Sequence, residues 1–321
     1  MISVAMTTYN GEKFVQEQII SIINQTKKVD EIIICDDCST DHTTEIIQSL
    51  QNQYKDFNIK LYFNEKNLGY RENFKKAISL CTGDYIFLSD QDDIWKEKKI
   101  EEMTKKMQMN ANIEVLASSF TYIDENSTLL KGEEKNNTLY LGNIVDKQLK
   151  PIKFEELLVH NYFQGCTLVM NKAMKEIFLT YFTNQIPHDW LIVILSAARQ
   201  SMYFWNSPLS YYRIHSNNTI GVDNLGKSKF SILKEKFTYT FRSKYARDGL
   251  NLINALYDSQ FPFDVDRIQT MKECEEFFNA YLVSLQEGKM IDLNNTSYRK
   301  YYYMFRTKNG VLVDRIYCLL H

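Results

Sequence analysis

The chain has 321 residues, of which 44% are apolar and 24% charged, with only four prolines and eleven glycines. This composition excludes collagen-like, low-complexity and wholly disordered chains, and the length suits one large domain with a smaller appended region. Thirty-eight Lys and Arg against forty Asp and Glu give a net charge of −2. The chain as a whole therefore has no positive field of the kind that attracts nucleic acid.

Membrane, secretion and disulfide signals are weak. The longest strongly apolar run, 190–195, is about a third of the roughly 20 residues that a membrane helix needs. Residues 1–15 lack a basic flank leading into an apolar stretch, so we expect a cytoplasmic protein without a signal peptide. Six cysteines are too few for a disulfide scaffold, and the C-x-x-C pair Cys35 and Cys38 lacks a second pair to complete a zinc site.

Strands and helices alternate through the first 125 residues. The apolar spacing predicts strands at 2–7, 31–35, 59–63, 85–88 and 113–124, and helices at 12–26, 42–54, 71–81 and 96–110. Alternation at this spacing predicts a parallel sheet with helices on both faces.

The second half of the chain has a different pattern. It predicts helices at 153–160, 172–182 and 188–199, an apolar segment at 166–170, and strands at 201–205 and 209–214. Beyond about 227 the strand and glycine signals fade, and the sequence becomes helical, aromatic and locally basic. We therefore expect a first domain over 1–225 and a mainly helical region over 226–321.

Polar residues follow four successive predicted strands, at 7–10, 36–37, 64–71 and 90–93. The carboxyl ends of parallel strands meet at one edge of a sheet, where ligands bind in such folds. Turns and helix caps alone can account for an isolated Asp or Asn after a strand. Four such clusters in register indicate a binding site.

The fourth cluster places three carboxylates, Asp90, Asp92 and Asp93, within four residues. Their mutual repulsion raises the pKa of each unless a cation is present. Mg²⁺ or Mn²⁺ suits such ligands, and Mg²⁺ usually shares its shell with substrate phosphates, so we expect a substrate that carries a diphosphate. The alternative is an acidic start to the helix that follows Trp95.

Five short segments are distinctive motifs: VAMTTYNG at 4–11, IICDDCSTD at 33–41, NLG at 67–69, TGDYI at 82–86 and SDQDDIW at 89–95. Together they resemble the inverting nucleotide-sugar glycosyltransferases of family 2, and the last has the form found in rhamnosyltransferases of bacterial surface polysaccharides. The resemblance is dense over 1–125, scattered over 160–220 and almost absent beyond 228. It implies a GT-A fold, a Rossmann-like mixed α/β sheet with helices on both faces, which would precede the helical C-terminal region that the sequence pattern predicts.

The resemblance also implies which residues bind the donor. Those implied for the nucleotide are Thr7, Thr8, Tyr9, Asp36, Asp37, Asn67, Arg71 and Asp90. Asp37 is implied to accept the N3–H of uracil or thymine, a proton that cytosine lacks. Asp92, with Asp90 and His215, is implied to hold the metal. Gln91 departs from the small or acidic residue usual at its position, which leaves the division of roles between Asp90 and Asp92 open.

A second group of residues lies about a hundred positions later. The resemblance implies that Asp189 is the general base for the acceptor hydroxyl, that Trp190 and Gln164 border the acceptor, and that Arg213 faces the diphosphate. Asp189 is also a plausible helix cap, and the segment around Arg213 and His215 can also be a surface turn. His188 is the rival base, because histidine titrates near neutrality.

Two other classes of function stay open. The segment 221–228 matches the G-x-x-x-x-G-K-S pattern of a nucleoside-triphosphatase P-loop, although little strand sequence follows it. A non-catalytic module that binds a nucleotide sugar without turnover is the other alternative. The four carboxylates Asp37, Asp90, Asp92 and Asp189 are all present, which argues against that module.

The sequence therefore predicts a metal-dependent, inverting glycosyltransferase, using Mn²⁺ or Mg²⁺, that moves a sugar from a dTDP- or UDP-sugar. Rhamnose is the favoured sugar, with glucose, galactose and N-acetylhexosamines open, and the expected acceptor is a bacterial surface polysaccharide or lipid-linked glycan. Between Lys227 and Arg247 there are seven basic residues and one acidic residue, with apolar residues at helical spacing. For 226–321 we accordingly expect a role at the inner membrane surface, near the acceptor or in a homodimer.

Overall fold

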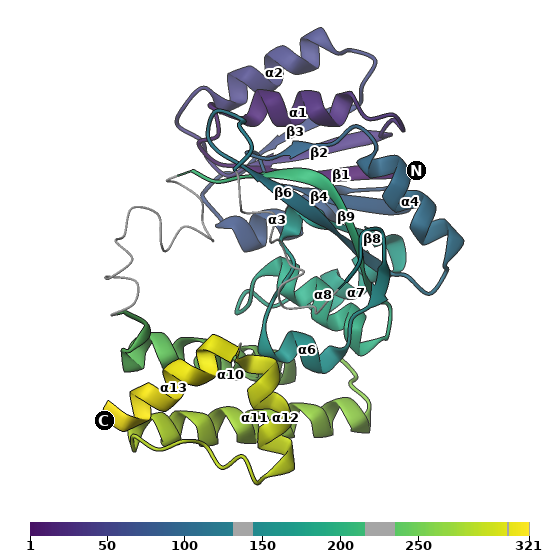
Figure 1. The fold of residues 1–321 in the computed structure, drawn as a ribbon. Coiled ribbons are helices and arrows are strands. Elements are labelled where there is room, and N and C mark those ends of the chain that lie inside the picture. Colours follow the sequence, from purple (N-terminus) through teal and green to yellow (C-terminus); the bar gives the residue numbers. More distant parts are fainter. Residues whose placement is uncertain (131–143, 216–234, 307, 321) are drawn as a thin grey trace. The chain divides into compact units, whose positions relative to one another are not determined.

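The computed structural model describes residues 1–130, 144–215, 235–306 and 308–320, and the chain divides into two compact units (Figure 1). Unit 1 consists of Met1–Ile152 and Tyr162–Asn217, and unit 2 of Lys153–Asn161 and Asn218–His321. The helix predicted at 153–160 was assigned to the first domain, but it belongs to unit 2, because its apolar side packs against helices of that unit. The boundary predicted at 225 lies outside the described residues.

Unit 1 is built on one mixed sheet with the strand order β3-β2-β1-β4-β8-β6-β9-β5, and β7 pairs with β9. The strands are β1 (Ile2–Thr8), β2 (Glu31–Asp36), β3 (Ile59–Phe63), β4 (Tyr85–Ser89), β5 (Ile94–Trp95), β6 (Val115–Ile123), β7 (Leu149–Pro151), β8 (Leu168–Asn171) and β9 (Met202–Arg213). The first four strands are parallel. β8 then runs antiparallel to both β4 and β6, so the sheet is mixed, as the resemblance implied.

Helices cover both faces of this sheet (Figure 1). They are α1 (Val15–Ile23), α2 (Thr43–Gln53), α3 (Tyr70–Leu80), α4 (Lys99–Met109), α7 (Lys172–Thr180) and α8 (His188–Ala198). On one face α1, α2 and α4 share a core with β1 and β2, in which Val15, Ile19 and Ile22 repeat every three or four residues. On the other face α3 packs on β1 and β2, and α7 and α8 pack on α3.

Two details of the sheet differ from the prediction. β9 is one strand rather than the two expected at 201–205 and 209–214, because its register with β6 shifts near Ser118 and Ser119 while pairing continues on both sides. β5 pairs with β9 and was not predicted, since two residues carry no periodic signal. β5 ends the loop 90–93 that follows β4.

The described part of unit 2 is helical, with α6 (Phe154–Val159), α10 (Tyr239–Asp258), α11 (Val265–Gln286), α12 (Thr296–Phe305) and α13 (Lys308–Leu320). Its core contains a buried carboxylate, Asp314, which accepts hydrogen bonds from Tyr281 (2.9 Å) and Tyr302 (3.0 Å). Asp314 also pairs with the buried guanidinium groups of Arg242 and Arg306. No helix in the described parts of the chain is both long and apolar enough to cross a membrane.

Candidate active site

The turn after β1 is fastened to the turn after β2. Thr8 Oγ1 donates to Asp36 Oδ2 at 2.7 Å, and Asp36 also accepts from the backbone N (2.9 Å) and Oγ (2.6 Å) of Ser39. Thr8 and Asp36 were both predicted to bind the nucleotide, and the structure gives each a part in holding the two turns together. Thr7 is buried beside them, whereas Tyr9 is 50% exposed.

Asp37 is buried and organises the loop before α3. Its Oδ1 accepts from Leu68 N (2.8 Å) and Asn64 Nδ2 (2.6 Å), and its Oδ2 accepts from Gly69 N (2.9 Å). A carboxylate offers about four lone-pair directions, so these bonds leave about one. Asn67, predicted to lie near the nucleotide, donates to the backbone oxygen of Asp37 at 3.1 Å. The structure therefore brings Asn67 and Asp37 together, as expected for one pocket.

Arg71 lies in the first turn of α3. Its Nε donates to Tyr70 Oη at 3.0 Å, and its NH1 donates to the backbone oxygen of Asn184 at 2.7 Å. Asn184 lies in the segment that leads into α8. Arg71 thus joins the start of α3 to the segment that precedes α8, the helix that carries Asp189.

Asp92 and His215 meet although 123 residues separate them in sequence, with His215 Nε2 2.8 Å from Asp92 Oδ2. Neighbouring ligands on an octahedral ion with bonds of about 2.1 Å are about 3 Å apart. The pair therefore fits two adjacent positions on one divalent cation with little rearrangement. These are two of the three residues predicted as metal ligands.

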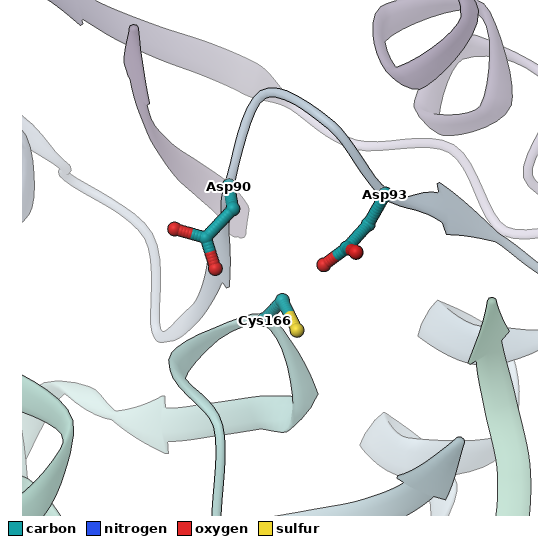
Figure 2. A group of neighbouring side chains, drawn as sticks. All are labelled: Asp90, Asp93 and Cys166. Atoms are coloured by element: carbon teal, nitrogen blue, oxygen red, sulfur yellow. The ribbon is translucent and has the colours of Figure 1, made fainter. Parts of the chain in front are cut away.

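Asp90, the third predicted ligand, lies with Asp93 and Cys166, and the ligand atoms of the three are within 4.8 Å of one another. Figure 2 shows Asp90 and Asp93 at the two ends of one loop, with both carboxylates directed toward the space near Cys166. Burial raises the pKa of Asp90 well above its ordinary value, and the charges of Asp92, Asp93 and Asp189 raise it further. Burial and the charge of Asp92 raise the pKa of Asp93 to about 7. The cluster thus has the repulsion that the sequence predicted and that a cation relieves.

Lys99 is a buried cation beneath this loop that the sequence analysis missed. Its Nζ donates to the Cys166 backbone oxygen (2.5 Å) and to Ser210 Oγ (2.8 Å), and lies 4.1 Å from the centre of the Trp95 ring. Burial lowers the pKa of Lys99 to about 8, and the charge of Asp93 opposes that shift. A signal existed, because Lys99 lies four residues before buried Met103 and so shares the apolar face of α4.

The residues predicted for the acceptor lie on α8 and beside the 3₁₀ turn η1 (Gly165–Thr167). Asp189, 9% exposed, accepts from Trp190 N at 2.7 Å in the first turn of α8. Its charge contributes to the raised pKa of Asp90, so it is close enough to act on the carboxylate cluster. Gln164 precedes η1 and accepts from Thr167 N at 2.9 Å through its backbone oxygen. Gly165, the residue after Gln164, lies close to His188, the residue before Asp189, because a Cβ added at Gly165 would be 3.1 Å from the His188 ring. Asp189 and Gln164 therefore lie on adjoining elements.

The structure places Arg213 differently from the prediction that it faces the diphosphate. It is 1% exposed, and its Nε donates to the Asp92 backbone oxygen at 2.7 Å. Its two terminal nitrogens donate to Glu17 Oε2 (2.6 Å) and Ser127 Oγ (3.0 Å). Because these bonds direct the guanidinium into the protein, Arg213 holds the loop that carries Asp92. The P-loop-like segment 221–228 lies outside the described residues.

The chain is similar in sequence to a known family and to several of its members. The model for "Glycosyl transferase family 2" matches residues 3–178. The dTDP-rhamnosyl transferase RfbG of Shigella flexneri is 31% identical over 274 residues, which cover 80% of this chain and 86% of that protein. The UDP-Glc:alpha-D-GlcNAc-diphosphoundecaprenol beta-1,3-glucosyltransferase WfgD of Escherichia coli is 26% identical over 74% of this chain and 84% of its own length.

Two solved structures resemble the fold. TarS 1–349 of S. aureus has a TM-score of 0.55, with 16% identity over 100% of this chain and 92% of that one. The mannosyltransferase PcManGT of Pyrobaculum calidifontis, in complex with GDP-Man and Mn²⁺, has a TM-score of 0.51, with 14% identity over 99% of this chain and 86% of that one. At these identities the likeness shows the fold alone, which is the GT-A fold predicted from the sequence. The chain belongs to glycosyl transferase family 2.

Proposed function

We propose that the chain is an inverting, metal-dependent glycosyltransferase that moves rhamnose from dTDP-rhamnose to a bacterial surface glycan. The observation that carries the proposal is the pairing of Asp92 with His215 at 2.8 Å, beside the turns that follow β1 and β2. A cation held by this pair suits a diphosphate leaving group, and the turns suit a nucleoside. The preference for rhamnose is supported by the similarity to RfbG, whereas the similarity to WfgD keeps UDP-glucose as the competing donor.

The nucleotide pocket is proposed to recognise a pyrimidine by its imide proton. Three of the lone-pair directions of Asp37 are already taken by the protein, so about one is left for the N3–H of uracil or thymine. The exposed ring of Tyr9 offers a surface on which the base can stack. Cytosine carries no proton at N3, so CDP-sugars should be rejected.

Inversion is proposed to follow from a single displacement in which Asp189 takes the proton of the incoming hydroxyl. Asp189 lies in the first turn of α8 and is not one of the two residues, Asp92 and His215, that would hold the cation. A divalent ion bound there neutralises charge on the leaving diphosphate. No covalent enzyme intermediate is needed, and orientation of donor and acceptor supplies the remaining acceleration.

A donor panel tests this function. Purified protein is incubated with Mn²⁺ or Mg²⁺ and with dTDP-rhamnose, UDP-glucose, UDP-N-acetylglucosamine or a CDP-sugar, and release of the nucleoside diphosphate is measured. We expect release from dTDP-rhamnose above the others, dependence on the divalent ion, and none from the CDP-sugar. Release from the CDP-sugar at the same rate would overturn the assignment of Asp37.

Unit 2 is proposed to hold the enzyme at the inner membrane surface, where a lipid-linked acceptor is available. Within the described part of the basic segment, Lys236, Lys244 and Arg247 are exposed together with Tyr245. Basic and aromatic side chains of this kind favour an anionic lipid surface. Co-sedimentation with vesicles containing phosphatidylglycerol, but not with neutral vesicles, is the expected result. Light scattering of the purified chain tests the proposed homodimer.

A further inference from the structure

Gln91 lies between Asp90 and Asp92 in the loop 90–93, here called the metal loop. Its side chain pairs with the backbone of the turn after β1, residues 8–11, here called the donor turn. Tyr9 N donates to Gln91 Oε1 at 2.8 Å, and Gln91 Nε2 donates to Tyr9 O at 3.0 Å. Both distances are near the most common values for N–H···O bonds, and the amide uses its donor and its acceptor at once. Two loops that are 82 residues apart in sequence are thereby joined by a reciprocal pair of bonds.

Gly11 makes room for this contact. A Cβ added at Gly11 would lie 2.5 Å from Gln91 Cδ and closer still to Gln91 Oε1. The backbone of Gly11 does not occupy the left-handed region, and its N–H donates to Thr43 Oγ1 at 2.7 Å, a bond that alanine would keep. The small size of Gly11 is therefore needed for the position of Gln91 rather than for the turn itself.

The rest of the donor turn is held from the other side. Thr8 donates a hydrogen bond to Asp36, and Asn10 Oδ1 accepts from Thr40 N at 2.8 Å, so the turn after β1 is hydrogen-bonded to the turn after β2. Gln91 adds the connection to the metal loop, whose next residue is Asp92. A side chain at this position that is shorter, or that cannot both donate and accept, breaks the connection without touching any proposed ligand.

We propose that Gln91 is a positioning residue that couples metal binding to nucleoside binding through the protein. The inference rests on the proposed function of the site. An ion held by Asp92 and His215 would restrict the motion of the metal loop. The two hydrogen bonds from Gln91 would then restrict the backbone of Tyr9 as well. By linkage, a bound nucleoside must favour the ion by the same factor. This coupling exists even for a nucleoside without phosphates, which cannot touch the ion through a diphosphate.

Equilibrium dialysis with labelled thymidine and uridine, with and without MnCl₂, isolates this coupling in the full-length chain. In the parent we expect Mn²⁺ to tighten nucleoside binding several-fold, and in Gln91→Ala we expect the Mn²⁺ effect to disappear. Two neutral hydrogen bonds also predict a loss of about 5- to 100-fold in dTDP or UDP affinity in Mn²⁺. Gln16→Ala, an exposed glutamine on α1, is the matched control and should behave as the parent.

A double-mutant cycle separates positioning from general damage. Gly11→Ala displaces the Gln91 amide, so it should weaken dTDP binding in the parent but add nothing in the Gln91→Ala background. Equal costs in both backgrounds, parental nucleotide affinity in Gln91→Ala, or an absence of the Mn²⁺ effect on nucleosides in the parent would each overturn the inference. Failure of the parent to bind UDP or dTDP at all would overturn the proposed function as well, so the two failures are distinguishable.

Discussion

Replacing Asp189 by asparagine tests the proposed base while leaving its surroundings in place. Asp189 Oδ1 accepts from Trp190 N at 2.7 Å, and an amide oxygen can accept the same bond, so the start of α8 is preserved. What is lost is a group able to take a proton. A positioned general base contributes about 10²- to 10⁴-fold. We therefore expect kcat to fall by at least about 10²-fold, which is about 2.7 kcal/mol of transition-state stabilisation.

The structure also predicts that the neighbouring histidine is not the base. His188 is 5% exposed, and its ring stacks on Phe74 with the centroids 3.9 Å apart and the planes 18° apart. Neither of its ring nitrogens has a hydrogen-bond partner among the described residues. Burial lowers the pKa of His188 to about 3, so the ring is a poor proton acceptor at assay pH. His188→Gln should lower Tm through lost stacking and leave kcat within a few-fold of the parent.

The two variants are compared by product formation at saturating donor and by the Kd for dTDP with Mn²⁺. Asp189→Asn removes one of the charges that raise the pKa of Asp90, so nucleotide and metal binding should persist. Asp56→Asn, at an exposed turn, controls for the loss of a carboxylate elsewhere. A dead His188→Gln beside a near-parental Asp189→Asn would show that the base has been misassigned.

Three further outcomes are expected. Asp92→Ala should abolish the Mn²⁺ dependence of UDP or dTDP binding with Tm unchanged, and parental Mn²⁺-dependent affinity would contradict the metal assignment. Asp314→Asn leaves the buried guanidinium groups of Arg242 and Arg306 without an opposing charge, so urea unfolding should show a loss of about 3–5 kcal/mol. Burial lowers the pKa of His160 from 6.5 to about 4, so between these pH values the unfolded chain binds a proton that the folded chain does not. The contribution of neutral His160 to folding stability is therefore complete above pH 6.5 and is lost as the pH falls toward 4. The urea midpoint of His160→Gln should therefore depend less on pH over that window, and an unchanged pH dependence would argue against this cause.

The first four strands could be predicted because each carries its own apolar run, and the first three are each followed directly by a helix. The reversal of direction at β8 could not, since its pairing with β4 on one side and β6 on the other is decided by distant segments. The register shift that lets β9 continue as one strand is likewise a property of two partners, so neither sequence alone signals it.

Residue type predicted which side chains lie close together better than it predicted the direction in which each one extends. Asp92 and His215 were predicted together as metal ligands, and the structure places His215 Nε2 2.8 Å from Asp92 Oδ2. Arg213 was predicted to face the diphosphate, whereas in the structure it donates to the backbone of Asp92 and holds that loop. Sequence spacing does not say in which direction a long side chain extends. Lys99 was overlooked because it lies in a helix with many solvated charges, although its spacing from Met103 places it on the buried face.

The path of the chain through the two units has a consequence for how the protein is made. α6 is synthesised before the whole of β9, yet it packs against α10, α11 and α12, which follow it by about 80 residues or more. Translation adds about 5–20 residues per second. For several seconds the apolar side chains of Phe154, Leu157 and Leu158 therefore have no partner from their own unit. A chain cut after residue 217 would keep that exposed face permanently. Unit 1 should consequently be expressed alone only with 153–161 replaced by a polar linker.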